Sequence, residues 1–264
     1  MTDALAAHLQ AKRPSISAVL VVCNEANNLP RCLASLHWVD EVLVVDTGST
    51  DATIEIARTH GCRVITTPWK GFGATKGFAV TAAAHDWILS LDADEVVGDR
   101  LRDRLIRLLE EGPQHQGYRP RFRTSYLGRE IRHCGWDNEY HLRVFNRRHG
   151  NYAEMHLHES VVLDGSVLQL EEEVLHNPYP TIEAHLNKVC LYSGLGALQL
   201  RQQGRHASLP EAFARAVLKF VKMYLFQAGF LDGAHGLILS GISSYAVLCK
   251  YLRLWELTRC KPSS

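Results

Sequence analysis

Net charge is nearly absent from this 264-residue sequence, in which 29 Lys and Arg residues face 28 Asp and Glu residues and leave +1. A protein that holds a polyanion by bulk electrostatics needs a strongly basic surface. The balance therefore excludes nucleic acid as a partner held by a global positive field. Any phosphate recognition has to be local, through a few placed side chains.

Paired cysteines are also absent, because the seven cysteines are odd in number and none stands in a Cys-x-x-Cys pair. This pattern argues against a disulfide framework and against a zinc cluster. We therefore expect a protein of the reducing cytoplasm.

A long apolar run is missing as well. Residues 1–15 contain no apolar segment followed by a small-residue cleavage site, so nothing there predicts export. The longest stretch without a charged residue, 233–249, has 17 residues, short of the ~20 that a membrane-spanning helix needs. We expect a buried helix, or one that lies along a membrane surface, rather than a full span.

What is present is an alternation of apolar strands and helices, which predicts an α/β fold. The expected strands cover 16–22, 41–45, 63–67 and 87–91, and the expected helices cover 27–36, 52–59, 74–84 and 100–110. Polar residues gather where these strands end, and in open α/β sheets ligands bind beyond the carboxyl ends of the strands. The pattern predicts a nucleotide-binding half over residues 14–112.

The composition changes after Gly112-Pro113. Residues 113–180 are rich in aromatic side chains, Arg and His, with short strand-like runs at 141–145 and 160–163, which suits a half that binds an acceptor. We expect residues 14–180 to form the catalytic domain. Residues 181–264 read as a helical C-terminal region, with one apolar helical stripe formed by Phe213, Val217, Phe220 and Tyr224.

Two acids follow the apolar run 87–91 directly. Asp92 and Asp94 stand two residues apart where the chain leaves strand geometry, so both carboxylates can reach one side. Such a pair suits a hard divalent cation that bridges a diphosphate. The alternative is a solvated turn, but a buried strand does not normally end in acids unless a cation or water meets them.

Polar residues also follow the expected strands 16–22 and 41–45, and each of them has both a ligand-binding and a structural interpretation. Asp46 directly follows four apolar residues, which favours a ligand role. Asp51 is also a candidate for nucleotide-sugar binding, although it could merely cap the next helix. Asn24 and Glu25 could read a base or ribose edge, or Glu25 could simply solvate the loop.

A glycine-rich segment, 71–77, carries the cation Lys76. It matches neither a P-loop nor the dinucleotide fingerprint, so the sequence lacks the motif that a P-loop kinase or a dehydrogenase would need. Lys76 either meets a phosphate or is a surface lysine.

Taken in order and spacing, the segments 22–25, 45–53 and 91–95 resemble a family 2 glycosyltransferase of GT-A fold. The likeness covers nearly the whole chain after residue 14. Further segments resemble the bacterial lipopolysaccharide-core β-glucosyltransferase branch, and these are 69–73, 140–145, 158–159, 176–177 and 229–233. The chain departs from the pattern at Gly77, where many relatives have an asparagine after the lysine.

The resemblance implies a mixed sheet flanked by helices and a helical C-terminal appendage. It implies nucleotide contacts from Asn24, Glu25, Asp46 and Lys76. Asp92 would meet the ribose and the metal, and Asp94 would coordinate Mg²⁺ or Mn²⁺. This allocation agrees with the chemistry, because a departing diphosphate develops negative charge that a cation stabilises.

Inversion at the anomeric carbon in one displacement needs a base on the acceptor hydroxyl, opposite the leaving group. Asp137 lies beside Trp136, a possible sugar platform, and we favour it slightly over Glu159; Glu139 is nearby. In the alternative, Asp137 caps a turn and Glu159 pairs with an arginine such as Arg143 or Arg147.

Three histidines are candidates for a further metal ligand. His156 and His158 would share one side of a strand, and His176 ends another strand-like run. The set is incomplete as a zinc site, and a structural or acceptor-binding histidine is an equal alternative. We retain His158 as a candidate ligand beside Asp92 and Asp94.

The resemblance implies transfer of a hexose, most simply glucose from UDP-glucose, onto a lipopolysaccharide inner-core or related glycolipid. We expect the enzyme in the cytoplasm, in peripheral contact with the inner face of the membrane. Two alternatives stay open: a sugar-phosphate nucleotidyltransferase, which would release pyrophosphate, and a non-catalytic scaffold at the membrane surface.

Overall fold

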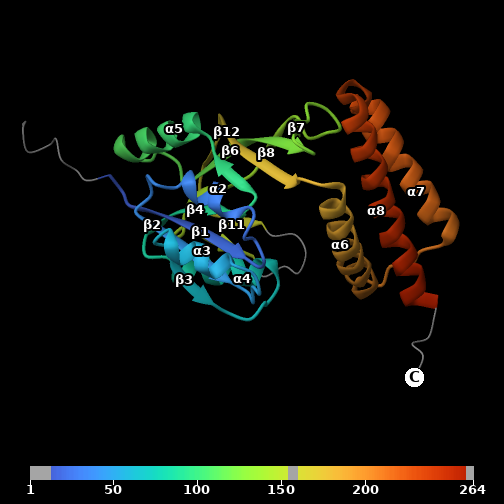
Figure 1. Ribbon diagram of the computed structural model, residues 1–264, viewed down its shortest axis with the longest axis horizontal. Coiled ribbons are helices and arrows are strands. Elements are labelled where there is room, and N and C mark those ends of the chain that lie inside the picture. The colour runs from blue at the N-terminus through green and yellow to red at the C-terminus, as the bar shows by residue number, and fades with distance from the viewer. Residues whose placement is uncertain (1–12, 154–159, 260–264) are drawn as a thin grey trace, which may run out of the picture. The chain divides into compact units, whose positions relative to one another are not determined.

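The computed structural model describes residues 13–153 and 160–259, whose elements are shown in Figure 1. The chain divides into two compact units. The sheet unit consists of residues 13–121, 140–153 and 160–174. The helical unit consists of residues 122–139 and 175–259.

Four parallel strands begin the sheet. β1 (Ile16–Val22) lies between β2 (Glu41–Asp46) and β4 (Trp87–Leu91), and β3 (Arg63–Thr66) pairs with β2. All five residues of β4 and six of the seven in β1 are buried. Burial along the whole strand is typical of parallel strands with helices on both faces, as the apolar runs predicted.

Helices connect these strands, and their bounds are α2 (Leu29–Ala34), α3 (Thr53–Thr59), α4 (Phe72–Ala82) and α5 (Asp99–Glu110). α5 buries three leucines at helical spacing, Leu101, Leu105 and Leu109. Ala79 and Val80 of α4 belong to the same core cluster as Val19 and Ile88. α5 thus turns its apolar stripe to the core and its charges to solvent, whereas α4 also buries its one charged side chain, Lys76.

The sheet continues with strands of mixed direction. β9 (Val144–Asn146) pairs antiparallel with both β4 and β6 (Gly117–Tyr126). With β12 (Val167–Tyr179) and β5 (Glu95–Val97) the order is β3-β2-β1-β4-β9-β6-β12-β5. Further short strands are β7 (Arg129–Glu130) and β8 (Glu139–Tyr140), both paired with β6, and the separate pair β10 (Gly150–Tyr152) and β11 (Val161–Leu163). The mixed sheet flanked by helices confirms the GT-A fold expected from the resemblance.

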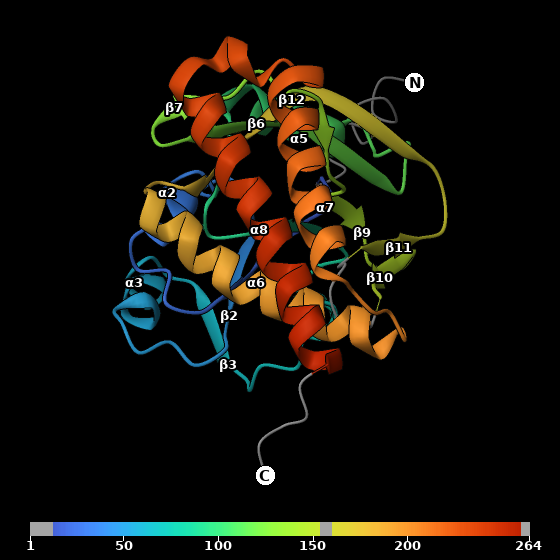
Figure 2. The ribbon, with the colours of Figure 1, turned by 90° about the vertical axis from the view of Figure 1, so that its right-hand side faces the viewer.

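The helical unit contains three long helices, α6 (Ile182–Gln202), α7 (Leu209–Val221) and α8 (Gly233–Arg259). The side chains of Thr181 and Ser208 cap α6 and α7 by accepting hydrogen bonds from the backbone N–H groups of Ala184 and Glu211. α8 packs against both α6 and α7, as Figure 2 shows. A π-helical turn, Lys222–Phe226, and a 3-10 turn, Gly229–Asp232, join α7 to α8.

The expected apolar stripe is only partly exposed, because Phe220 is half-buried and Tyr224 lies half-buried in the turn after α7. α7 buries the small residues Ala212 and Ala216, while Phe213 and Val217 are exposed. α8 is continuous over 27 residues, longer than the 17-residue uncharged run. By length and composition, Gly229–Arg259 could cross a membrane, and 17% of its most apolar window is buried.

Candidate active site

The polar ends of three strands meet at one edge of the sheet unit. Val22 of β1 is in register with Asp46 of β2, and Leu20 is in register with Leu91 of β4. Because these strands are parallel, the residues that follow Val22, Val45 and Leu91 emerge on the same side. The sequence prediction of one shared edge is therefore met by the register itself.

Asn24 joins the loop after β1 to the loop after β2. Its backbone is left-handed (φ 57°), and its side-chain oxygen accepts a hydrogen bond from the Thr50 N–H at 2.8 Å. Its own N–H donates to the Ser49 hydroxyl at 2.9 Å. The next residue, Glu25, donates its N–H to the Thr53 hydroxyl at 2.8 Å. These bonds hold the two loops in one fixed arrangement.

Asp46 shapes the turn after β2. Its side chain is completely buried and accepts hydrogen bonds from the N–H groups of Gly48 (2.9 Å) and Ser49 (3.1 Å). Gly48 has φ of +115°, which side chains rarely tolerate, so the turn requires glycine there. Backbone N–H groups satisfy a buried carboxylate well. Asp46 thus fixes the shape of the loop that faces the shared edge.

Asp51 closes the first turn of α3. It is exposed and accepts hydrogen bonds from the Thr53 N–H at 3.0 Å, from the Thr53 hydroxyl, and from the Ala26 N–H at 3.1 Å. The Thr53 hydroxyl is the main cause that lowers the pKa of Asp51. The N-cap of α3 is Ala52, without a side-chain cap, so Asp51 does not cap the helix as the sequence suggested but joins Thr53 to the loop after β1.

A charged centre stands at the end of β4. The Lys76 ammonium lies 2.6 Å from one carboxylate oxygen of Asp92, and the Arg143 guanidinium lies 3.1 Å from the other. Arg143 also contacts Glu95, whose other oxygen accepts the Asp92 N–H at 3.1 Å. Lys76 is 6% exposed in its side chain, so it is no surface lysine. We call Lys76, Asp92, Glu95 and Arg143 the charged centre.

Burial sets the electrostatics of the charged centre. Burial raises the pKa of Glu95, and the contact with Arg143 opposes that rise. Burial would lower the pKa of Arg143, but the carboxylates of Glu95 and Asp92 raise it well above its usual value. Arg143 therefore stays charged and holds the Asp92 carboxylate in place. The Asp92 side chain remains 35% exposed, so the same carboxylate still faces solvent.

The donor atoms here suit a hard divalent cation. Asp92 and Asp94 are both partly exposed carboxylates on the turn after β4. Within residues 13–153 and 160–259 no cluster of three or more His, Cys, Asp or Glu residues could hold a metal ion. Mg²⁺ typically uses one or two carboxylates and completes its shell with phosphate oxygens and water. The residues present fit such a cation, which would bind together with a diphosphate.

Arg143 and Glu95 contact Asp92, and the sequence identified neither of them as a site residue. Glu95 stood visibly in the acidic cluster after β4, but Arg143 comes from a segment 51 residues beyond Asp92. At Gly77, where many relatives carry asparagine, the Asn151 amide of β10 donates to the Gly77 carbonyl at 3.3 Å. An amide side chain thus lies against Gly77, supplied by another strand.

The structure describes the surroundings of Asp137 but not those of Glu159, the other candidate for the catalytic base. Asp137 belongs to the helical unit and is exposed, beside Trp136, which stacks on Tyr179 with ring centres 6.2 Å apart. Glu159 lies outside the described residues, as do His156 and His158. His176 meets the Thr124 hydroxyl at 3.4 Å, so it has a structural partner.

Comparison with known proteins identifies the family. A family model described as "Glycosyl transferase family 2" matches residues 17–160. An uncharacterized glycosyltransferase of Rickettsia bellii is 29% identical over 94% of this chain and 89% of its own length. One of Rickettsia felis is 30% identical over 92% of this chain and 89% of its own length.

Two further similarities are more distant. The lipopolysaccharide core biosynthesis glycosyltransferase LpsC of Rhizobium meliloti is 26% identical over 84% of this chain and 85% of its own length. A crystal structure of glucosyl-3-phosphoglycerate synthase from Mycobacterium tuberculosis with Mn²⁺, UDP and glucosyl-3-phosphoglycerate is 28% identical. That match covers 43% of this chain and 45% of the other, with a TM-score of 0.37. From the family match over more than half of its length, the chain belongs to glycosyl transferase family 2.

Proposed function

We propose that the protein is an inverting hexosyltransferase that moves glucose from UDP-glucose to a lipopolysaccharide inner-core or related glycolipid. The observation that carries this proposal is the charged centre at the end of β4, where Lys76 and Arg143 orient a partly exposed Asp92. The similarity to LpsC supports the acceptor class. Family membership displaces both alternatives, the nucleotidyltransferase and the non-catalytic scaffold.

Asp94 and Asp92 would hold Mg²⁺ or Mn²⁺, with His158 as a further candidate ligand. When bound, the cation supplies positive charge against the diphosphate. Arg143 and Lys76 offset the charge of the Asp92 carboxylate and thereby reduce its repulsion of the donor diphosphate. The loops shaped by Asn24, Asp46 and Asp51 would hold the nucleotide.

The reaction needs one proton transfer and one displacement. The acceptor oxygen forms a bond to the anomeric carbon while the bond from that carbon to the phosphate oxygen breaks, so UDP leaves with the electron pair. The hydroxyl proton passes to a carboxylate on the side opposite the leaving group. We assign this base to Asp137, with Glu159 as the alternative.

The helical unit supports a role at the membrane surface. Residues 175–259 contain nine Lys and Arg residues against four Asp and Glu residues. Large apolar side chains are exposed on α7 and on the turns after it, among them Phe213, Val217 and Phe226, the last 83% exposed. Apolar side chains beside cations are typical of a surface that binds anionic lipid. We propose peripheral contact with the inner face of the cytoplasmic membrane.

Vesicle co-sedimentation tests the membrane role. We expect the chain to bind vesicles that contain phosphatidylglycerol, less at high salt, and Phe226→Asp to weaken binding about 10-fold or more, because it removes a large apolar group from the interface. Val162→Asp is the matched control, since Val162 is an exposed apolar residue of the sheet unit. Equal binding by both variants would contradict the proposal. Lys222→Glu tests the electrostatic part separately.

The transfer itself is tested with purified protein, UDP-glucose and membranes that carry a truncated lipopolysaccharide core. We expect UDP release only when donor, acceptor and Mg²⁺ or Mn²⁺ are all present. A thermal-shift screen of nucleotide sugars with and without Mn²⁺ identifies the donor, because a specific ligand stabilises the folded state by mass action. Pyrophosphate release in place of UDP release would contradict the proposed reaction.

A further inference from the structure

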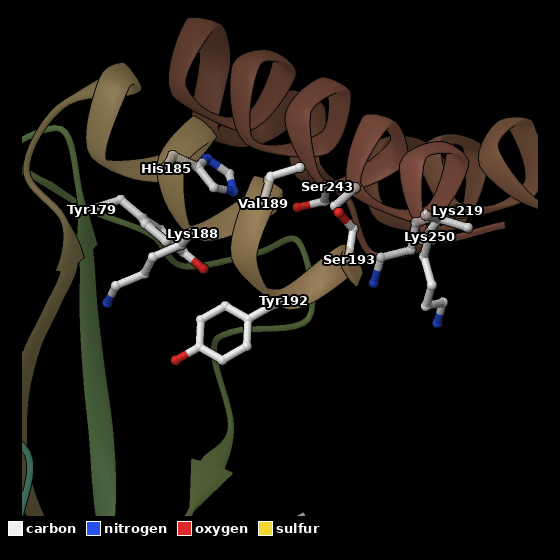
Figure 3. A pocket seen from close by; sticks show the side chains of 11 residues that line it. Tyr179, His185, Lys188, Val189, Tyr192, Ser193, Lys219, Ser243 and Lys250 are labelled. Atoms are coloured by element: carbon white, nitrogen blue, oxygen red, sulfur yellow. The ribbon is translucent and has the colours of Figure 1, made fainter. Parts of the chain in front are cut away.

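The helical unit contains a pocket whose lining residues have no role in the reaction proposed above. Its volume is about 310 Å³, and Figure 3 shows how its side chains lie. All of its lining residues belong to the end of β12 and to the three long helices. They are Tyr179, His185, Lys188, Val189, Tyr192, Ser193, Lys219, Ser243, Ala246, Val247 and Lys250. None of the eleven is an acid.

Two lysines face one end of this pocket. Lys219 comes from α7 and Lys250 from α8, and both are half-buried. Burial lowers the pKa of both amines. Lys222 and then Lys250 lower that of Lys219 further, and Arg215 lowers that of Lys250. The Lys250 stem lies on Gly196 of α6, where an added Cβ would stand 2.9 Å from its Cδ. The glycine therefore makes room for the lysine.

These two cations lack a carboxylate partner. Across residues 13–153 and 160–259 the structure places no carboxylate within 4 Å of the Lys219 or Lys250 amine. Glu211 of α7 pairs instead with Arg215 at 2.8 Å. Two neighbouring, partly buried cations without a counter-charge are costly, and such arrangements occur where an anionic ligand supplies the charge.

The rest of the lining suits a sugar. Ser193 and Ser243 bring hydroxyl groups near the lysine end, as Figure 3 shows. At the other end the Tyr179 ring stacks on His185 with centres 4.0 Å apart, and Lys188 lies over Tyr179. Burial lowers the pKa of His185 to about 4, so this histidine is neutral at pH 7, and Lys188 is the cation at this end of the pocket. Aromatic faces and hydroxyl groups are common partners of bound sugar rings.

We propose that this pocket binds a phosphorylated sugar, with the phosphate against Lys219 and Lys250 and the ring toward Tyr179. Lysine amines bind phosphate as point charges, and the hydroxyl groups add directional hydrogen bonds. The volume holds a monosaccharide phosphate. Only the identity of the molecule that bears this sugar rests on the proposed function. If that function is right, the glycolipid acceptor would place a phosphorylated sugar of its own in this pocket.

Calorimetric titration of the full chain, without nucleotide or divalent metal, tests the pocket. The probes are glucose 6-phosphate, glucose and inorganic phosphate. We expect glucose 6-phosphate to bind more tightly than inorganic phosphate, and glucose alone to bind weakest. The double variant Lys219→Gln/Lys250→Gln should bind glucose 6-phosphate at least about 10-fold more weakly, since each lysine supplies a charge-assisted contact.

The matched control is Arg201→Gln/Arg205→Gln, which removes the same charge from exposed positions of the helical unit outside the pocket. It should bind glucose 6-phosphate like the wild-type chain. Equal loss in both double variants would overturn the proposal, because only net charge would then matter. Unchanged binding in the lysine variant, or no binding by the wild-type chain, would overturn it as well.

Two further arms separate the possible sources of the phosphate. If inorganic phosphate binds as tightly as glucose 6-phosphate, the sugar part of the proposal is wrong. If the lysine pair affects only binding to phosphatidylglycerol vesicles, the ligand is a lipid headgroup and the sugar assignment is wrong. Asp94→Asn should leave this binding intact, so the pocket can be confirmed even if the proposed transfer fails.

Discussion

The sheet unit and the helical unit differ in whether their buried or half-buried cations have carboxylate partners. In the sheet unit, Lys76 and Arg143 both meet carboxylates, and the described residues carry 15 Lys and Arg against 18 Asp and Glu. In the helical unit the numbers are 12 against 7, and the Lys219–Lys250 pair meets no carboxylate among the described residues. The near-zero net charge of the whole chain therefore conceals an acidic unit and a basic one.

The two units also differ in their apolar surface. Of the 18 large apolar side chains that are exposed among the described residues, all but Trp69, Phe78 and Val162 lie in the helical unit. A soluble surface rarely gathers so many. The comparison teaches that the sheet unit is internally compensated, whereas the helical unit has surface and charge left for partners outside the chain.

The largest expected effect concerns the metal site that we propose for the sheet unit. Asp94→Asn should abolish UDP release, a loss of about 10³-fold or more, because the diphosphate would lose its cation. Asp103→Asn, a surface acid of α5 paired with Arg102, should keep full activity. Initial rates of UDP release measure both. Full activity of Asp94→Asn in buffer treated with EDTA would contradict the metal role.

The next effect concerns the acceptor side. Asp137→Asn should lower kcat by about 10² to 10⁴, as the loss of a general base does, with donor affinity little changed. Steady-state kinetics separate kcat from KM, and binding of UDP-glucose gives the donor affinity. If Glu159→Gln behaves this way and Asp137→Asn is near normal, the acid after His158 is the base.

A stability measurement sharpens the comparison directly. Arg143→Met leaves Glu95 buried without its guanidinium, so the free energy of unfolding should fall by about 3–5 kcal/mol. Arg148→Met is the control, because Arg148 is 74% exposed in its side chain. Urea unfolding followed by circular dichroism measures both. Adding Glu95→Gln to Arg143→Met should recover part of the loss, and equal stability of the two arginine variants would contradict the compensation argument.

The smallest effect is expected in the helical unit. Lys219→Gln/Lys250→Gln should leave the free energy of unfolding unchanged or raise it by up to about 1 kcal/mol, because it removes like charges that repel and are partly desolvated. The same urea unfolding experiment measures it. A clear loss of stability would show that the lysines hold the helices together, and the contrast with Arg143 would disappear.

Much of the sheet unit was predictable from local sequence. The strands at 16–22 and 87–91 and the polar residues after them follow from apolar runs and turn chemistry, and the structure has β1 and β4 at those residues. The acidic cluster after β4 was equally visible. The Arg143 partner was not, because pairing of β9 with β4 brings it there, and no local pattern encodes a contact across 51 residues.

The helical unit was less predictable. The stripe of Phe213 and Val217 was correctly placed on one helical face, but periodicity does not say whether that face meets a core or solvent. The burial of Ala212 and Ala216 shows that α7 packs through small residues instead. The lysine pocket needs α6, α7 and α8 together, so it has no signature in any one segment.

The most direct test of the central claim is the product of a single reaction. Purified enzyme, UDP-glucose, Mn²⁺ and a core-truncated lipopolysaccharide are incubated, and UDP and the glycolipid mass are measured together. We predict that UDP release equals the gain of one hexose by the glycolipid, that both vanish in Asp94→Asn, and that the new linkage is inverted relative to the donor. UDP release without hexose on the glycolipid, or a product that retains the donor's anomeric configuration, would contradict the account.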